Sequence, residues 1–148
     1  MVSLGPGQKP YIQNHYPHML AEDVRVWTKF LRTDAQRIKE VWYDIRVGQS
    51  VLLAEGASDM ERKIALGLTR KRIDAVCSVE GGYWVVEVKP YANMYAMGQV
   101  MTYVRLFAQE YATPGELTPV LVCDSYDDDL VDEFDEFDEF GILVVETS

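Results

Sequence analysis

Histidine and cysteine are scarce in this chain of 148 residues, which contains two of each. Neither cysteine has a histidine at the spacing of a zinc site, and no neighbouring residues complete a metal-binding set around His15 or His18. Cys77 and Cys123 both fall in stretches that favour β-strands. We therefore expect two small buried side chains rather than a disulfide or a structural zinc ion.

Long apolar runs, a secretory leader and a nucleotide-binding loop are also missing. No apolar run approaches the roughly 20 residues needed to cross a bilayer, and the N-terminus lacks the basic start and apolar core of a signal peptide. No Gly-x-x-x-x-Gly-Lys sequence occurs, which argues against an ATP site of that type. With 48% hydrophobic and 26% charged residues, the composition is that of one soluble globular domain. These features predict a cytoplasmic protein with no membrane partner.

Lysine and arginine are absent from residues 106–148, which carry 13 Asp and Glu. Residues 1–105 hold all 14 Lys and Arg against 11 acids, a balance of +3. The net charge of −10 therefore arises in the C-terminal part of the chain. An acidic protein meets a polyanion slowly, but its mildly basic part is still able to carry a local anion-binding site.

The strongest structural signal is a pair of strand-like runs at residues 72–79 and 83–89, both rich in Val, Ile and aromatic residues. Gly81-Gly82 joins them, and a two-residue link of this kind predicts a β-hairpin. Apolar residues then recur at helical spacing over residues 91–111, with Met101 among those expected to face the core. This stretch predicts two paired strands followed by a long helix.

The predicted hairpin brings charged side chains together. If the two glycines form the turn, Glu80 lies opposite Tyr83 and Asp74 lies opposite Lys89. Asp74, Glu87 and Lys89 then point from one face, with the two acids about 7 Å apart at the backbone. Carboxylates at that distance repel each other unless a cation lies between them, and oxygen ligands suit Mg²⁺ or Mn²⁺. The lysine is placed to stabilise charge that develops on a phosphate.

Each of these residues also has an ordinary structural interpretation. Glu-x-Lys on a strand is usually part of a solvated face, and Asp74 alone could end a strand. The surrounding runs, however, are largely apolar, as strands covered by helices on both faces are. Charges on such strands cost free energy unless they are paired or bind a metal. The joint pattern therefore favours a functional site.

Asp74, followed by Glu87-Val88-Lys89 on the next strand and then by a helix, resembles the core of the PD-(D/E)XK nuclease superfamily. Ile73 stands where many members have proline, at a position that varies in the superfamily. The resemblance implies a restriction-endonuclease-like fold and Mg²⁺-dependent hydrolysis of phosphodiester bonds in DNA. It also implies that Asp74, Glu87 and the carbonyl of Val88 bind Mg²⁺ or Mn²⁺, with Lys89 beside the attacking water.

Gln99 and Tyr103 in the predicted helix resemble the Gln-x-x-x-Tyr motif of the RecB-like branch of that superfamily. The resemblance implies that Gln99 orients Lys89 or the DNA and that Tyr103 supports it. Glutamine is able to orient a water or a phosphate, and tyrosine to bind a phosphate or stack on a base. Alternatively, the two residues lie one helical turn apart and form an ordinary surface pair.

An acidic residue on the first helix often completes the metal site in this family. The predicted first helix spans residues 19–31, and Glu22 is our choice for that role, with Asp23 as the alternative. Both acids equally fit the first turn of a helix, where they favour the helix dipole. The apolar stripe expected to face the core consists of Leu20, Val24, Trp27 and Leu31.

A basic cluster, Arg70-Lys71-Arg72, runs directly into the strand that carries Asp74. Clusters of this kind are usually solvated loops. Here the position also suits contact with the phosphates of a nucleic acid. We therefore predict DNA as the partner and these three residues, with Tyr103, as its contacts.

The acidic C-terminal part is predicted to contain strands at 117–123 and 142–146 and a helix at 126–140 that repeats Asp-Glu-Phe three times. Its acids fit a solvated helix face better than a calcium loop, because the glycine and alternation of an EF-hand are missing. Such a helix is able to bind a basic protein partner.

The whole pattern predicts an N-terminal arm (residues 1–18) and a single α/β domain (residues 19–148) with a first strand at 41–47. The domain is expected to hold a mixed β-sheet flanked by helices. A second hypothesis is a catalytically silent protein that keeps the nuclease fold within a larger assembly, such as a phage particle, which would place it in a virion, or a repair complex. Homo-oligomers are compatible with either function.

Overall fold

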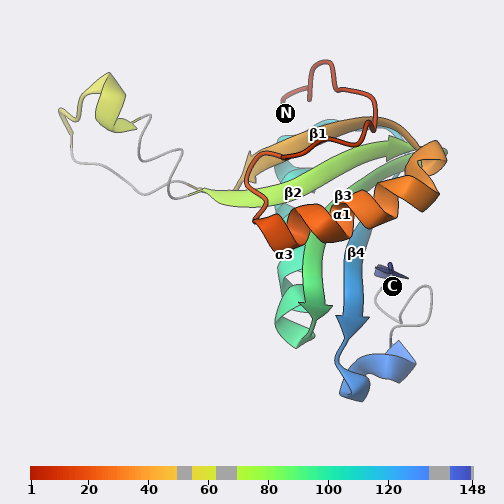
Figure 1. Cartoon of the computed structure of the whole chain (residues 1–148). Helices are drawn as coiled ribbons and strands as arrows, with labels where there is room; N and C mark the ends of the chain where they lie inside the picture. Colours follow the sequence, from red (N-terminus) through yellow and green to blue (C-terminus); the bar gives the residue numbers. More distant parts are fainter. Residues whose placement is uncertain (50–54, 63–69, 134–140, 148) are drawn as a thin grey trace.

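Five strands in the described residues form one mixed β-sheet with helices on both faces (Figure 1). The computed structural model describes residues 1–49, 55–62, 70–133 and 141–147. In spatial order the strands are β1 (Ile38–Val47), β2 (Lys71–Val79), β3 (Gly82–Ala92), β4 (Glu116–Tyr126) and β5 (Leu143–Glu146). The first three are antiparallel, whereas β4 runs parallel to β3 and β5 runs parallel to β4. The chain is thus a single α/β domain, as predicted.

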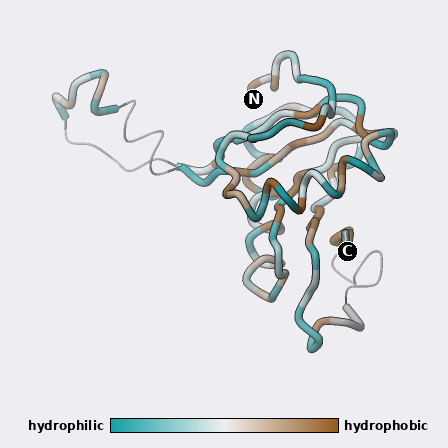
Figure 2. The backbone as a smooth tube through the Cα atoms, viewed as in Figure 1, coloured by the Kyte–Doolittle hydropathy of each residue, from teal (hydrophilic) through white to brown (hydrophobic). Residues whose placement is uncertain are grey.

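Helix α1 (Ala21–Asp34) covers one face of the sheet, mainly over β3 and β4. Its buried residues are Val26, Trp27, Phe30 and Leu31. The predicted stripe is therefore partly wrong, because Leu20 precedes the helix and is 67% exposed. Figure 2 shows apolar and polar residues alternating along this helix, as expected for one that covers a sheet with a single side.

Helix α3 (Met94–Glu110) covers the opposite face, over β3 and β4. The side chain of Asn93 caps it by accepting hydrogen bonds from the backbone N–H groups of Tyr95 and Ala96. The predicted start at residue 91 is wrong, because β3 stays paired with β4 up to its last residue. Met101 is also misplaced by the prediction, since it is exposed rather than turned to the core.

The hairpin between β2 and β3 differs from the predicted one by a single turn residue. Val79 pairs with Gly82, so the turn consists of Glu80 and Gly81 rather than two glycines. Gly81 has a φ of 85°, which favours glycine. Gly82 lies inside β3, where a Cβ would come within 1.9 Å of the carbonyl oxygen of Glu116. Close approach of two backbones, rather than a turn, therefore requires the second glycine.

The observed pairing of β2 with β3 is displaced by two residues from the predicted pairing. A displacement by one residue would turn every side chain to the other face, but a displacement by two restores the original faces. The expectation that Asp74, Glu87 and Lys89 meet on one side of the hairpin thus does not depend on the misplaced turn. The predicted neighbours do change, because Asp74 comes level with Glu87 rather than with Lys89.

The N-terminal arm is attached to the edge of the sheet along β1. Gln8 forms an isolated antiparallel bridge with Val41, with two backbone hydrogen bonds of 2.8 and 3.0 Å. Tyr16 is fully buried and its ring centre lies 5.0 Å from that of Tyr43. Tyr11 of the same arm is 70% exposed. Tyr16 is therefore the tyrosine that fixes the arm to the sheet.

In the acidic C-terminal part both predicted strands are present, and only the start of the predicted helix lies within the described residues. β4 extends to Tyr126, and the helix that follows in the described residues is a 3₁₀ helix, Asp128–Glu133. Residues 134–140, with most of the Asp-Glu-Phe repeats, lie outside the described residues, as do residues 51–54. No helix within the described part of the chain has the length and apolar character to span a membrane.

The two glycines at the hairpin provide a test of this arrangement. We expect Gly82→Ala to lower the free energy of unfolding by about 3 kcal/mol or more, because its Cβ meets a backbone carbonyl that cannot move aside. Gly81→Ala should cost only about 1 kcal/mol, the strain of a left-handed alanine in open space. Urea denaturation of both variants measures the difference. Equal losses would support the turn predicted from the sequence instead.

Candidate active site

β2 and β3 separate just beyond the pair formed by Ala75 and Val86 (Figure 1). From there β2 remains paired only with β1, and β3 only with β4. We call the opening between residues 71–74 of β2 and 87–92 of β3 the fork. Because the sheet is open at the fork, groups from both of its faces are able to meet there.

Two carboxylates take over the hydrogen bonding of the strands at the fork. Asp74 accepts a hydrogen bond of 2.9 Å at Oδ2 from the backbone N–H of Val88. In return the backbone N–H of Asp74 donates to Oε1 of Glu87 at 3.3 Å. The side chains of β2 and β3 thus bridge the gap that the backbone ladder leaves. Asp74 is only 6% exposed and Glu87 only 2%.

Burial raises the pKa values of both acids, and the charge of a neighbouring acid adds to each shift, that of Asp74 for Glu87 and that of Asp23 for Asp74. Burial is the largest cause for Glu87, and the neighbouring charge of Asp74 adds to it, so its pKa lies well above the usual 4.5. The pKa of Asp74 is also raised by burial, against the opposing effects of the Val88 N–H and the charge of Lys89. The pair therefore favours either a shared proton or a bound cation.

The fork opens into a cavity of about 490 Å³. Asp74, Glu87 and Lys89 line it together, as the sequence predicted, and Val88 lies between them. Asp23 reaches the same cavity from the first turn of α1. The cavity thus combines three acids and one amine drawn from two strands and a helix.

Gln99 and Tyr103 line the same cavity from α3. The side-chain amide of Gln99 donates a hydrogen bond of 3.0 Å to the hydroxyl of Tyr103. Tyr103 is 8% exposed, so the pair belongs to the wall of the cavity rather than to the outer surface of the helix. The alternative of an ordinary surface pair does not fit this burial.

Glu22 does not line this cavity, and its neighbour Asp23 does. Glu22 is exposed, whereas Asp23 is half-buried and accepts a hydrogen bond of 3.1 Å from the backbone N–H of Leu20. One residue along a helix changes the direction of a side chain by about 100°. The sequence offered both acids, and Asp23 is the one that the structure brings to Asp74.

Two of the predicted phosphate contacts are already engaged in ion pairs. Arg70 pairs with Glu110 of α3, and Arg72 forms two hydrogen bonds with Asp44 of β1, at 2.7 and 2.6 Å. Both arginines still line the cavity. Lys71 is exposed and does not line it. The cluster is therefore not a set of three equivalent cations.

His18, which the sequence analysis did not select, also lines the cavity. Its φ of 70° is unusual for a residue other than glycine, and Asp44 has the only other such value in the described residues, at 56°. Both residues lie next to the fork, and His18 is among the groups that lower the pKa values of Asp44 and Asp74. No periodicity in the sequence marks them; only backbone geometry does.

The residues at the fork fit a hard divalent cation that keeps much of its water. In the described part of the chain, no three His, Cys, Asp or Glu side chains are close enough to form a complete ligand set. Mg²⁺ is commonly held by one or two carboxylates, with water and phosphate oxygens as its other ligands. Asp74 and Glu87 are two such carboxylates, and both line the cavity.

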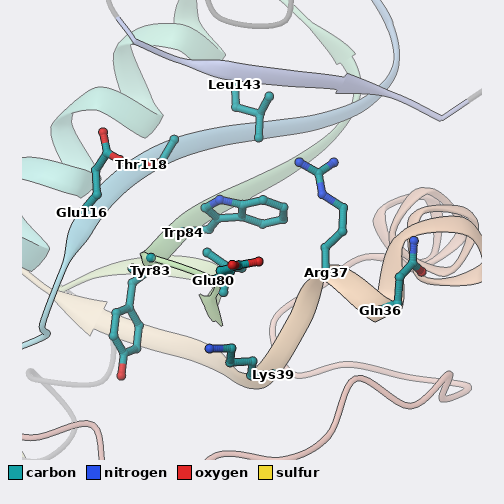
Figure 3. A pocket seen from close by; sticks show the side chains of 12 residues that line it. Gln36, Arg37, Lys39, Glu80, Tyr83, Trp84, Glu116, Thr118 and Leu143 are labelled. Atoms are coloured by element: carbon teal, nitrogen blue, oxygen red, sulfur yellow. The ribbon is translucent and has the colours of Figure 1, made fainter.

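A second cavity, of about 420 Å³, lies at the opposite end of the hairpin (Figure 3). The guanidinium carbon of Arg37 is 4.8 Å from the centre of the Trp84 ring and covers it. Lys39 and Glu80 also line this cavity, and both are exposed. It lacks the buried carboxylates that distinguish the fork.

Comparisons with known proteins leave the site to be interpreted from its own chemistry. No protein-family model, no curated protein and no solved structure matches this chain.

Replacing Glu87 tests whether its raised pKa makes the stability of the folded protein depend on pH. A raised pKa stabilises the protonated folded form, so the metal-free protein should lose stability as the pH rises from about 4.5 through the raised pKa of Glu87. We expect Glu87→Gln to remove this loss. The variant should gain about 1.4 kcal/mol over wild type per pH unit in that window, and the gain should level off above it.

Thermal unfolding in EDTA at a series of pH values measures this gain. Glu80→Gln is the matched control, because Glu80 is exposed at the turn and should give a flat difference. A difference for Glu87→Gln that is independent of pH would contradict the coupling.

Proposed function

We propose that this chain is a nuclease-like domain of the PD-(D/E)XK type that hydrolyses phosphodiester bonds in DNA with Mg²⁺ or Mn²⁺. The observation that carries the proposal is the pairing of two buried carboxylates, Asp74 and Glu87, beside Lys89 in one cavity. Buried acids are costly without a partner, and catalytic sites are where such costs recur.

The strand order supports the same proposal. Three antiparallel strands, a helix that crosses the sheet and a parallel fourth strand are compatible with a restriction-endonuclease-like fold. Asp74, Glu87 and Lys89 lie on the two strands that such a fold would use. Gln99 and Tyr103 lie on the crossing helix, in agreement with the motif of the RecB-like branch.

Asp74, Glu87 and the carbonyl of Val88 would hold the metal ion. Asp23, rather than Glu22, would act on the site through its negative charge. When bound, the ion would lower the pKa of water and neutralise charge on the phosphate. Because the pKa values of Asp74 and Glu87 are raised, the binding of a cation by these two side chains would release a proton.

Lys89 would supply the positive charge closest to the reacting phosphate. In the reaction a water oxygen bonds to phosphorus, one P–O ester bond breaks, and the products are a phosphate monoester and an alcohol. The water loses a proton, and the departing oxygen gains one from solvent. Lys89 would stabilise the negative charge that accumulates on the phosphate oxygens, while Gln99, fixed by its hydrogen bond to Tyr103, would orient the ammonium group or the DNA.

DNA cleavage by the purified chain tests the proposal. We expect wild type to cut linear, circular or branched DNA with Mg²⁺ or Mn²⁺ and to be inactive in EDTA. Lys89→Ala should reduce the rate by a factor of about 10² or more, because a charge at the reacting centre is lost.

Lys39→Ala is the matched control, since Lys39 lies at the far cavity and should leave the rate unchanged. RNA of the same sequence distinguishes the two nucleic acids. The proposal fails if wild type and Lys89→Ala produce the same background of cleavage.

A second candidate is an interaction protein that keeps this fold without catalysis. Four exposed apolar side chains favour it: Tyr91, Met94, Tyr95 and Met101 are 51%, 63%, 75% and 39% exposed. They lie at the end of β3 and along α3, and residues 90–104 contain no charged side chain. The aspartates 127–129 lie near Tyr91, where their charge helps to raise its pKa after the effect of desolvation. An apolar surface beside acids suits a basic protein partner.

Metal titration and partner capture distinguish the two candidates. For an interaction protein, we expect Mn²⁺ to give no more heat with wild type than with Asp74→Asn. A captured basic partner should be lost with Tyr95→Asp and retained with Tyr11→Asp, because Tyr11 is similarly exposed, at 70%, but belongs to the arm. Mn²⁺ binding that disappears in Asp74→Asn would argue against this candidate.

A further inference from the structure

Two arginines face each other across β1 and β2 next to the fork. Arg46 of β1 is the registered partner of Arg72 of β2. Like charges at directly opposed positions normally destabilise a sheet. Asp44 lies two residues before Arg46 and offsets part of this repulsion, because its carboxylate reaches both guanidinium groups.

The carboxylate is shared unequally between the two arginines. Arg72 binds both oxygens of Asp44, at 2.7 and 2.6 Å, whereas Nη2 of Arg46 lies 3.7 Å from Oδ2. Burial acts to raise the pKa of Asp44, but Arg72 and then Arg46 outweigh it, so the pKa is lowered and the group is ionised at neutral pH. One negative charge therefore faces two positive charges.

Arg46 keeps donors for another acceptor. Its Nε is buried and has no hydrogen-bond partner among the residues that the structure describes. Its side chain is nonetheless 39% exposed, and that of Arg72 is 31% exposed. Because Nε is enclosed, a phosphate would bind at the terminal Nη1 and Nη2 nitrogens of Arg46, which are able to donate two parallel hydrogen bonds.

We infer that Arg46 and Arg72, held by Asp44, form a binding site for a backbone phosphate of the nucleic acid. This inference rests on the proposed function, because Arg72 lines the same cavity as Asp74. Two residues along a strand separate Arg72 from Asp74 by about 7 Å. The phosphate held there is therefore a neighbour of the one that reacts, and it fixes the position of the strand along the fork.

The acids of the proposed metal site line the same cavity as Arg72. A divalent cation bound at Asp74 and Glu87 would add positive charge beside the phosphate. The nucleic acid should therefore bind more tightly with Mg²⁺ than in EDTA.

A purely structural role of Asp44, Arg46 and Arg72, in which they only stabilise the pairing of β1 with β2, predicts a different experimental result. Asp44 has a left-handed backbone, with a φ of 56°, and Arg72 alone makes the two short hydrogen bonds to it. If the trio is purely structural, loss of Arg46 changes stability and leaves nucleic-acid binding untouched. Binding and unfolding therefore have to be measured on the same variants.

The test is fluorescence anisotropy with a labelled DNA oligonucleotide, in the Lys89→Ala background so that the DNA stays intact. Arg46→Gln should raise Kd about 5- to 10-fold in Mg²⁺. It should also reduce the slope of log K against log salt by about one, the loss of one phosphate contact. Arg46→Lys should restore most of the slope but only part of the affinity, because a lysine lacks the forked donors.

Arg32→Gln is the matched control, because Arg32 is exposed in the last turn of α1 and should change neither quantity. The inference is overturned if Arg46→Gln binds DNA with wild-type slope and affinity, or if it shifts only the melting temperature. Oligonucleotides with and without a 5′-phosphate identify the source of the phosphate. If Arg46→Gln abolishes a preference for the 5′-phosphate, the site holds a terminal group; otherwise it holds an internal diester.

This outcome is separate from that of the proposed function. Absence of cleavage with an Arg46-dependent binding slope would reject catalysis and keep the phosphate site. If wild type cleaves DNA but Arg46→Gln binds DNA as tightly as wild type does, the proposed catalysis is kept and the phosphate site is rejected.

Discussion

The hydrogen bonds of Asp74 are the constraint on which the site depends. At the fork the backbone ladder between β2 and β3 ends, yet the strands must stay close enough to belong to one sheet. The Asp74 carboxylate accepts from the backbone of β3, and its own N–H donates to the side chain of Glu87. Side chains thus satisfy backbone groups that would otherwise be buried without partners. The same bonds aim two carboxylates into one space.

That arrangement explains why the acids are costly to keep. A sheet built only for stability would continue the ladder and place apolar residues at both positions. Here Glu87 is almost fully buried beside another acid, and its pKa is raised as a result. The opening in the sheet also admits groups from both faces, Asp23 from the side of α1 and Gln99 from α3. A fork of this kind is a way to bring residues from separate layers to one point.

The sequence predicts the members of this site better than it predicts their partners. Asp74, Glu87 and Lys89 could be grouped because strand parity survives an error of two residues in register. Glu22 could not be separated from Asp23, because the direction of a helical side chain depends on how the helix packs.

Long-range ion pairs were also beyond the sequence. Asp44 and Glu110 lie 28 and 40 residues from the arginines that they bind. Local spacing carries no information on such pairs. The basic cluster therefore looked uniform, although Arg70 and Arg72 form ion pairs and Lys71 is exposed without one among the residues that the structure describes.

An acidic protein is able to hold a polyanion if the local charge at the site is the one that counts. At physiological ionic strength, charges more than about 8 Å apart are largely screened, so the net charge of −10 says little about the charge at the fork itself. If Asp74 and Glu87 bind a divalent cation as proposed, the cation would add positive charge beside Lys89 and Arg72. In the proposed function the cation would therefore bind first and favour the binding of the nucleic acid.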